Sequence, residues 1–216
     1  MSNPLNKIER LQEILRERIV IIDGAMGTTI QQYKLSEEQF RGERFKDWKG
    51  KDLQGNNELL NLTQPQIIQE VHRRYFEAGA DIAETNTFNG QFISLADYGM
   101  ESLAYELSFA GAQCARRAAD EVMAAQPGRV CWVAGAIGPT TKTSSISTDV
   151  NDASSRGTNW DELVRAYSEQ VKALLDGGCD ILLVETIFDT LNAKAALFAI
   201  QNVFDERGIE AVPFSR

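Results

Sequence analysis

The stretch that decides the fold is Ile19-Val20-Ile21-Ile22-Asp23-Gly24-Ala25-Met26-Gly27-Thr28-Thr29. Its apolar, β-branched first part predicts a buried parallel strand that ends at Asp23. Glycines after a strand let the backbone approach a ligand closely, and ligands of α/β folds bind at the carboxyl ends of the strands. The stretch therefore predicts a binding site around Asp23. The alternative is an ordinary strand-to-helix turn that Asp23 caps.

The composition excludes several classes of partner. The 216-residue chain has a formal net charge of −9, which argues against nucleic acid or an anionic membrane as the main partner. No apolar run approaches the length of a membrane span, and the charged residues 1–17 contain no signal-peptide core. We therefore expect a cytoplasmic protein.

The cysteines and the histidine do not suggest a metal site. Cys114, Cys131 and Cys179 are widely spaced, odd in number and without a CxxC pair, which is typical neither of a disulfide framework nor of a zinc knuckle. We expect them to be small buried hydrophobic residues. The single histidine, His72, lies on a predicted helix and is expected to be structural. The chain therefore contains no complete metal site of its own.

Strand and helix patterns alternate along the chain. Apolar runs predict strands over 19–23, 81–88, 129–137 and 180–185, with the start of a fifth over 210–214. Helical spacing predicts helices over 3–18, 65–78, 94–126 (as two helices), 160–176 and 192–207. Two long polar loops are expected over 31–61 and 141–159.

This alternation predicts an α/β protein with a parallel sheet. A (β/α)8 barrel needs about 250 residues, so the chain would hold the first half of one, whereas a doubly wound sheet could close at this length. Residues 79–85 and 178–186 repeat one pattern, a glycine, an Asp-Ile strand start and a Glu-Thr strand end. Such repeated units favour the barrel, and Gly24-x-x-Gly27 matches the dinucleotide fingerprint poorly.

Three acids fall at predicted carboxyl ends of strands: Asp23, Glu84 and Glu185. Asn86, Thr85, Thr87 and Thr140 add neutral hydrogen-bonding groups at the same level. Buried acids are costly unless paired, so a convergent set implies a cationic ligand, such as an amino group or Mg²⁺. The glycine-flanked amides after the first strand suit an anion such as a carboxylate. Together these features suggest a zwitterionic amino acid, although each acid taken alone could be a cap or a structural hydrogen-bonding group.

The stretch Asp23-Gly24-Ala25-Met26-Gly27-Thr28 resembles the opening of the homocysteine S-methyltransferase family. Further segments resemble the cobalamin-dependent methionine synthases within that family, and the likeness runs from about Leu11 to Gly208. These segments are residues 40–45, 55–60, 84–88, 138–140, 145–147, 149–152 and 185–194.

The resemblance implies an N-terminal (β/α)8 module that binds homocysteine. In such proteins a zinc ion held by three cysteines activates the homocysteine thiolate. The thiolate takes a methyl group from methylcobalamin, which further modules recharge from methyltetrahydrofolate. Carried over to this chain, Asp23 and Glu185 would hold the amino group, the amides near Gly24, Ala25 and Met26 would bind the carboxylate, and Glu84 and Asn86 would support the pocket wall.

The chain departs from that family in one respect. The zinc cysteines of the family lie on later strands, so we expect them beyond Arg216, and Cys114, Cys131 and Cys179 do not match them. We therefore expect residues 1–216 to form one homocysteine-binding domain, incomplete at its C-terminus, without zinc and inactive alone. A Mg²⁺-dependent barrel lyase and a non-catalytic interaction module with exposed sheet edges are the alternatives.

Overall fold

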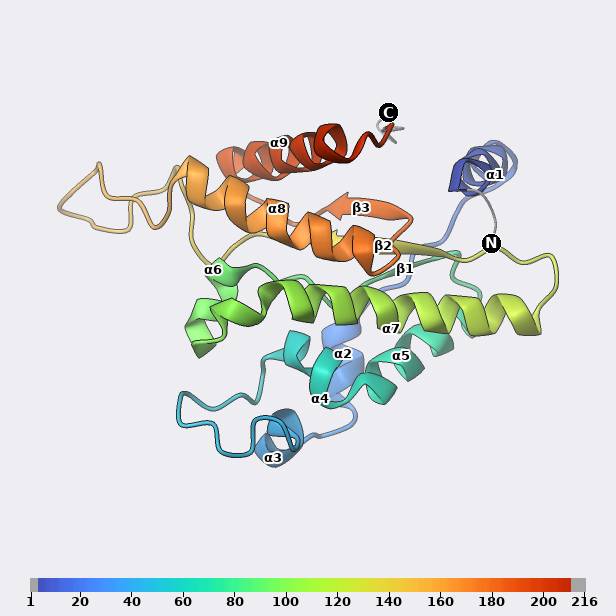
Figure 1. Cartoon of the computed structure of the whole chain (residues 1–216), viewed down its shortest axis with the longest axis horizontal. Helices are drawn as coiled ribbons and strands as arrows, with labels where there is room; N and C mark the ends of the chain where they lie inside the picture. Colours follow the sequence, from blue (N-terminus) through green and yellow to red (C-terminus); the bar gives the residue numbers. More distant parts are fainter. Residues whose placement is uncertain (1–3, 211–216) are drawn as a thin grey trace.

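The computed structural model describes residues 4–210, which form an α/β fold around a parallel three-stranded sheet (Figure 1). The strands are β1 (Ile82–Glu84), β2 (Trp132–Ile137) and β3 (Ile181–Val184), in the order β1-β2-β3. The register pairs Ile82 with Trp132 and Ala134 with Ile181. The predicted α/β class is confirmed.

Helices precede, connect and follow these strands. The α-helices are α1 (Pro4–Glu17), α2 (Met26–Gln31), α3 (Glu37–Arg41), α4 (Leu60–Thr63), α5 (Pro65–Ala78), α6 (Phe92–Leu95), α7 (Ala104–Ala125), α8 (Trp160–Asp176) and α9 (Thr190–Arg207). Short 3₁₀ turns are η1 (Asn57–Leu59), η2 (Ala96–Tyr98) and η3 (Glu101–Leu103). None of the helices in residues 4–210 is both long and apolar enough to cross a bilayer.

The predicted helices over 65–78 and 160–176 are confirmed at both ends. The prediction of one long polar loop over 31–61 is wrong, because this segment contains α3, η1 and the start of α4. Its apolar residues Leu35, Phe40, Phe45 and Leu53 are buried in a cluster beneath α5 and α7. They are too widely spaced for a helical or strand pattern, so only packing reveals that they are core residues.

The expectation of a buried first strand over 19–23 is also wrong. This segment forms a single parallel bridge, between Ile22 and Ile82, and Ile19, Ile21 and Ile22 are exposed. The segment lies at the edge of the sheet beside β1, so within residues 4–210 only one of its sides meets a neighbouring strand. The predicted fifth strand over 210–214 lies almost wholly outside the described residues.

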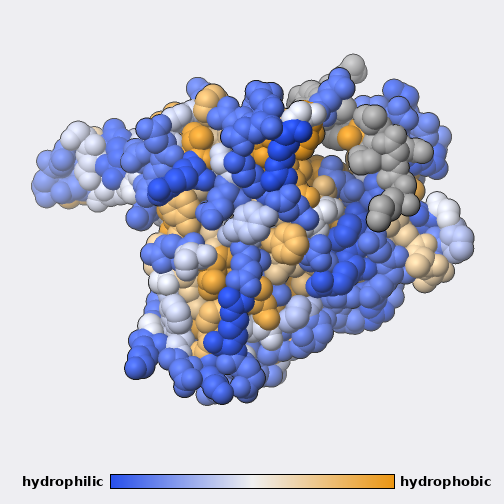
Figure 2. Space-filling model, in the orientation of Figure 1, coloured by the Kyte–Doolittle hydropathy of each residue, from blue (hydrophilic) through white to orange (hydrophobic). Residues whose placement is uncertain are grey.

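One face of the sheet, which we call the helix face, carries Ala83, Val133, Gly135 and Leu182. It packs against α5, α7, α8 and α9 through two buried apolar clusters. Figure 1 shows α8 in front of the sheet and α9 beside it, at the top of the view. A side chain at Gly135 would place its Cβ 2.9 Å from Leu174 of α8, so glycine is needed for this close packing. In Figure 2 hydrophobic atoms show mainly between the helices of this side, whose surface is otherwise largely hydrophilic.

The opposite face, which we call the pocket face, is covered at its amino-terminal end by α1. Leu11 and Ile14 of α1 pack on Trp132, whose indole Nε1 donates to the carbonyl of Lys7 over 3.2 Å. Lys7 also pairs with Asp180 at the start of β3, at 2.9 Å. The carboxyl-terminal end of the pocket face remains open for a ligand.

Asp180 ties three elements together. Its carboxylate accepts from Lys7 of α1, from Arg116 of α7 (2.8 Å) and from the peptide N–H of Val133 (3.0 Å). We expect Asp180→Asn to lower the free energy of unfolding by about 3 kcal/mol, because it leaves the half-buried Arg116 without its main partner. Urea unfolding followed by circular dichroism measures this value.

Asp120→Asn is the matched control, because exposed Asp120 pairs with the same Arg116 from one helical turn away. We expect it to cost no more than about 0.5 kcal/mol. Equal losses for the two variants would contradict the role assigned to Asp180.

Candidate functional site

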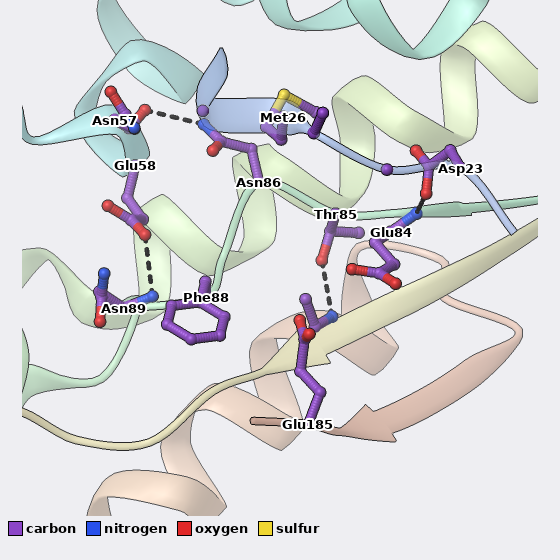
Figure 3. A pocket seen from close by; sticks show the side chains of 14 residues that line it. Asp23, Met26, Asn57, Glu58, Glu84, Thr85, Asn86, Phe88, Asn89 and Glu185 are labelled. Atoms are coloured by element: carbon purple, nitrogen blue, oxygen red, sulfur yellow. Dashed lines mark hydrogen bonds between the residues drawn. The ribbon is translucent and has the colours of Figure 1, made fainter. Parts of the chain in front are cut away.

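Three carboxylates converge at the carboxyl-terminal end of the pocket face (Figure 3). Asp23 follows the Ile22 bridge, Glu84 ends β1 and Glu185 follows β3. Because side chains alternate along a strand and the register aligns β1 with β3 through β2, Glu84 and Glu185 point to the same face. The repeated sequence pattern predicted this shared orientation, and the structure confirms it.

These carboxylates line a cavity of about 290 Å³. All seven residues predicted for the site line it: Asp23, Gly24, Ala25, Met26, Glu84, Asn86 and Glu185. Their predicted roles toward a ligand stay predictions. Thr85, predicted as a neutral hydrogen-bonding group at this level, also lines the cavity. The wall contains further residues that the sequence analysis did not select, namely Gly27, Asn57, Glu58, Phe88, Asn89 and Ala136.

Asp23 is held by the neighbouring strand. Its Oδ1 accepts a hydrogen bond from the peptide N–H of Glu84 at 2.8 Å. Asp23 does not cap α2. This helix begins at Met26, its N-cap residue is Ala25, and no side chain donates or accepts a capping hydrogen bond there. The alternative of a capped strand-to-helix turn is therefore wrong, and Asp23 is a wall residue of the cavity.

Two of these carboxyl groups, those of Asp23 and Glu84, have raised pKa values. Burial raises the pKa of Asp23 to about 7, and the charges of Glu84 and Glu185 raise it further. The hydrogen bond from the peptide N–H of Glu84 acts in the opposite direction and lowers this pKa. Burial also raises the pKa of Glu84 to about 7, with a further contribution from Glu185. Near neutral pH the site therefore holds protons that a bound cation could replace.

The backbone beside these acids is unusual. Ala25 and Thr186 have φ values of +47° and +53°, in the left-handed region that non-glycine residues rarely occupy. Ala25 lies two residues after Asp23, and Thr186 directly follows Glu185. Such strain concentrates at binding and catalytic sites, where the surrounding structure enforces it.

Hydrogen bonds among Asn57, Asn61 and Asn86, which we call the asparagine ladder, hold the cavity wall opposite Asp23. Asn86 Nδ2 donates to the carbonyl of Asn57 at 2.7 Å and to Oδ1 of Asn61 at 3.0 Å, while Asn61 Nδ2 donates to the carbonyl of Asn86 at 2.8 Å. These bonds attach η1 to the end of β1 and place Glu58 in the wall. A signal for Glu58 existed in the sequence, because it lies within the family-like segment 55–60.

The described residues do not form a zinc site. Within residues 4–210 no three His, Cys, Asp or Glu side chains lie close enough to hold a metal ion. Cys114, Cys131 and Cys179 lie in or against the apolar clusters away from the cavity, and burial raises the pKa of each thiol. Cys114 and Cys131 are buried, as predicted, and Cys179 is partly buried.

The raised pKa of Asp23 predicts a pH-dependent stability. Its folded pKa of about 7 lies above the ordinary value of 3.8, so the folded chain binds more protons and stability falls as pH rises between these values. We expect Asp23→Asn to flatten this fall and to make the chain more stable than the wild type at about pH 8. Thermal unfolding across this pH range measures the effect.

Asp47→Asn, at an exposed aspartate outside the cavity, is the control and should leave the pH profile unchanged. An Asp23→Asn profile with the same slope as the wild-type profile would contradict the pKa assignment.

Comparison with known proteins places this geometry in a family. The homocysteine S-methyltransferase family model matches residues 20–214. The structure is similar to crystal structures of the homocysteine methyltransferase MmuM from Escherichia coli. The metallated form has a TM-score of 0.67 at 22% identity and the oxidized form 0.68 at 22%.

The alignments cover 96% and 99% of this chain but 64% and 65% of those two chains, respectively. This chain thus spans slightly less than two thirds of the MmuM structures. At this identity the structural likeness supports the fold, and the family match is what assigns membership. The chain belongs to the homocysteine S-methyltransferase family.

Proposed function

We propose that this chain is the homocysteine-binding part of a cobalamin-dependent methionine synthase. The observation that carries the proposal is the convergence of Asp23, Glu84 and Glu185 in one cavity beside the Gly24–Met26 backbone. Family membership supports homocysteine as the ligand, and the similar MmuM is itself a homocysteine methyltransferase. The narrower assignment to the cobalamin-dependent enzymes rests on the segments that resemble them.

The ammonium group of homocysteine would lie between Asp23 and Glu185. Each is half-buried and lines the cavity, and no Lys or Arg side chain pairs with either one within residues 4–210. Burial, and to a lesser extent the charges of Glu84 and Glu185, raise the pKa of Asp23, and an ammonium group there would favour its ionised form. Glu84 would complete the acidic wall, while Asn86 holds that wall against η1.

The carboxylate of homocysteine would lie beside Gly24, Ala25 and Met26. Their peptide N–H groups precede or begin α2, so they lack intrahelical acceptors. None of them donates a hydrogen bond to another group in the described part of the chain. Free amides next to an acidic patch are complementary to a zwitterion, with one end for each charge.

The remaining parts of such an enzyme would come from outside these residues. We propose that the chain is the first half of a (β/α)8 barrel, a single domain incomplete at its C-terminus, in a cytoplasmic protein. Zinc ligands would lie beyond Arg216, and methylcobalamin and methyltetrahydrofolate would act through further modules. Because residues 4–210 offer no zinc site, we assign them no step of methyl transfer.

One observation favours a second role, as a non-catalytic interaction module. Ile19, Ile21 and Ile22 expose apolar side chains along the sheet edge, where another strand could pair. A stable oligomer that does not respond to homocysteine would support this role. A rise in Tm with Mg²⁺ but not with homocysteine would instead support the magnesium-dependent lyase.

Calorimetric titration tests the homocysteine proposal. We expect the reduced chain to bind L-homocysteine, and Asp23→Asn or Glu185→Gln to weaken binding about tenfold or more, because each removes a charge-assisted hydrogen bond. 4-Mercaptobutanoate, which lacks the ammonium group, should bind as weakly to the wild type as homocysteine binds to the variants. Asp47→Asn should bind homocysteine like the wild type, and equal affinities for all the variants would refute the proposed site.

Binding should also release protons. Asp23 and Glu84 hold protons near their pKa of about 7, and an ammonium group stabilises their ionised forms. At neutral pH the observed binding enthalpy should therefore depend on the ionisation enthalpy of the buffer, and Asp23→Asn should reduce this dependence. A buffer-independent enthalpy for the wild type would show that the acids do not meet the ammonium group.

A further inference from the structure

The strand β2 continues past the end of β1 beside the cavity. The last pair of the ladder between them is Glu84 with Ala134, and the last backbone bond runs from the peptide N–H of Thr85 to the carbonyl of Ala134 at 2.9 Å. Beyond this point, side-chain hydroxyl groups take the place of the β1 backbone as hydrogen-bond partners of β2. The carboxyl ends of the two strands are therefore joined by side chains.

Two threonines make this junction, and we call their side chains the hydroxyl bridge. The peptide N–H of Ala136 donates to Oγ1 of Thr85 at 3.0 Å, the bond drawn at Thr85 in Figure 3. Oγ1 of Thr87 donates to the carbonyl of Ala136 at 2.8 Å. The two threonine oxygens lie 2.6 Å apart, and Thr85 donates this bond because the hydrogen of Thr87 is already used.

The helix α8 holds the hydroxyl bridge from the helix face. The Nε2 atom of Gln170 donates to the carbonyl of Thr87 at 2.7 Å and to the carbonyl of Ala136 at 3.3 Å. Gln170 and Thr87 are both fully buried, and Thr87 does not line the cavity. Any effect of Thr87 on a ligand must therefore pass through its neighbours.

These neighbours include the three acids of the cavity. Glu84 directly precedes Thr85, and its peptide N–H holds the carboxylate of Asp23 at 2.8 Å. On the other side of β2, the peptide N–H of Glu185 donates to the carbonyl of Ile137 at 3.1 Å, one residue beyond the bridged peptide. The hydroxyl bridge thus lies between the pair Asp23 and Glu84 and the third acid.

Resting on the proposed function, we infer that Thr87 is a positioning residue, which through the hydroxyl bridge fixes the spacing between Asp23 and Glu185. An ammonium group between these carboxylates needs both within hydrogen-bond distance, and a displacement of about 0.5 Å is enough to weaken such a site. Without the bridge, water would replace the threonine hydroxyls and the strand ends would separate. A ligand without an ammonium group does not depend on this spacing.

Calorimetric affinities for two ligands test this inference. We expect the wild-type chain to bind L-homocysteine about tenfold more tightly than 4-mercaptobutanoate, which lacks the ammonium group. Thr87→Val keeps the volume and β-branching but cannot donate to Ala136, so this ratio should fall about threefold or more. Thr87→Ser keeps the hydroxyl group and should restore the wild-type ratio. A general loss of stability would weaken both ligands equally and leave the ratio unchanged.

Proton release adds a second readout. Burial raises the pKa of Asp23 and of Glu84 to about 7, so separation of the strand ends, which admits water, should lower both pKa values. The cavity wall also contains Glu58 and Glu185, which the substitution leaves in place. At neutral pH the binding enthalpy of Thr87→Val should therefore depend less on the buffer than that of the wild type.

Thr158→Val is the matched control, because Thr158 is also buried and donates to Glu162 at 2.7 Å, outside the cavity. It should leave the ratio and the buffer dependence unchanged. Thr87→Cys is a milder second variant, whose thiol packs as a small hydrophobic group and donates weakly, and it should lower the ratio in the same direction. Circular dichroism confirms that each variant folds.

The outcomes separate this inference from the proposed function. Wild-type preference for homocysteine that Thr87→Val and Thr87→Cys both retain in full would overturn the role of Thr87 while the proposed function stands. An equal fall in the ratio for Thr158→Val would also overturn it. Wild-type chain that binds no homocysteine, or binds both ligands equally, would overturn the proposed site and the inference with it.

Discussion

The site depends on the hydrogen bond from the peptide N–H of Glu84 to the carboxylate of Asp23. Together with the Ile22–Ile82 bridge, it attaches the edge segment to β1 and fixes Asp23 above the pocket face. The same contact brings the carboxylates of Asp23 and Glu84 close together, because Glu84 points into the cavity. Glu185, which follows β3, lines the same cavity. The strand register thus creates an acidic cavity whose repulsion a cationic group would relieve.

The acids at the two ends of the sheet differ in whether a cationic side chain pairs with them. At the amino-terminal end, Asp81 accepts two hydrogen bonds from Arg18, each 2.7 Å long, and Asp180 pairs with Lys7 and Arg116. These pairs connect α1 and α7 to the strands. The acids at the carboxyl-terminal end have no such cations within residues 4–210, so their charge is available to a ligand. The contrast separates structural acids from candidate binding residues more clearly than burial does.

The asparagine ladder links this acidic end to the rest of the cavity. By holding η1 on the end of β1, Asn86 and Asn61 place Glu58 opposite Asp23. A ligand with a charged head group and a polar side-chain end would then meet fixed partners at both ends. Preorganisation of this kind lowers the entropic cost of binding.

The sequence by itself determined the α/β class, the helices over 65–78 and 160–176, and the grouping of Asp23, Glu84 and Glu185, because these follow from local periodicity and from the two-residue repeat of strands. It also contained the family signature. Only the tertiary structure decided that Ile19–Ile22 is an exposed edge, that residues 31–61 supply core side chains, and that Glu58 faces the cavity. Burial, strand pairing and the shift of a carboxyl pKa depend on neighbours distant in the chain, which no local pattern specifies.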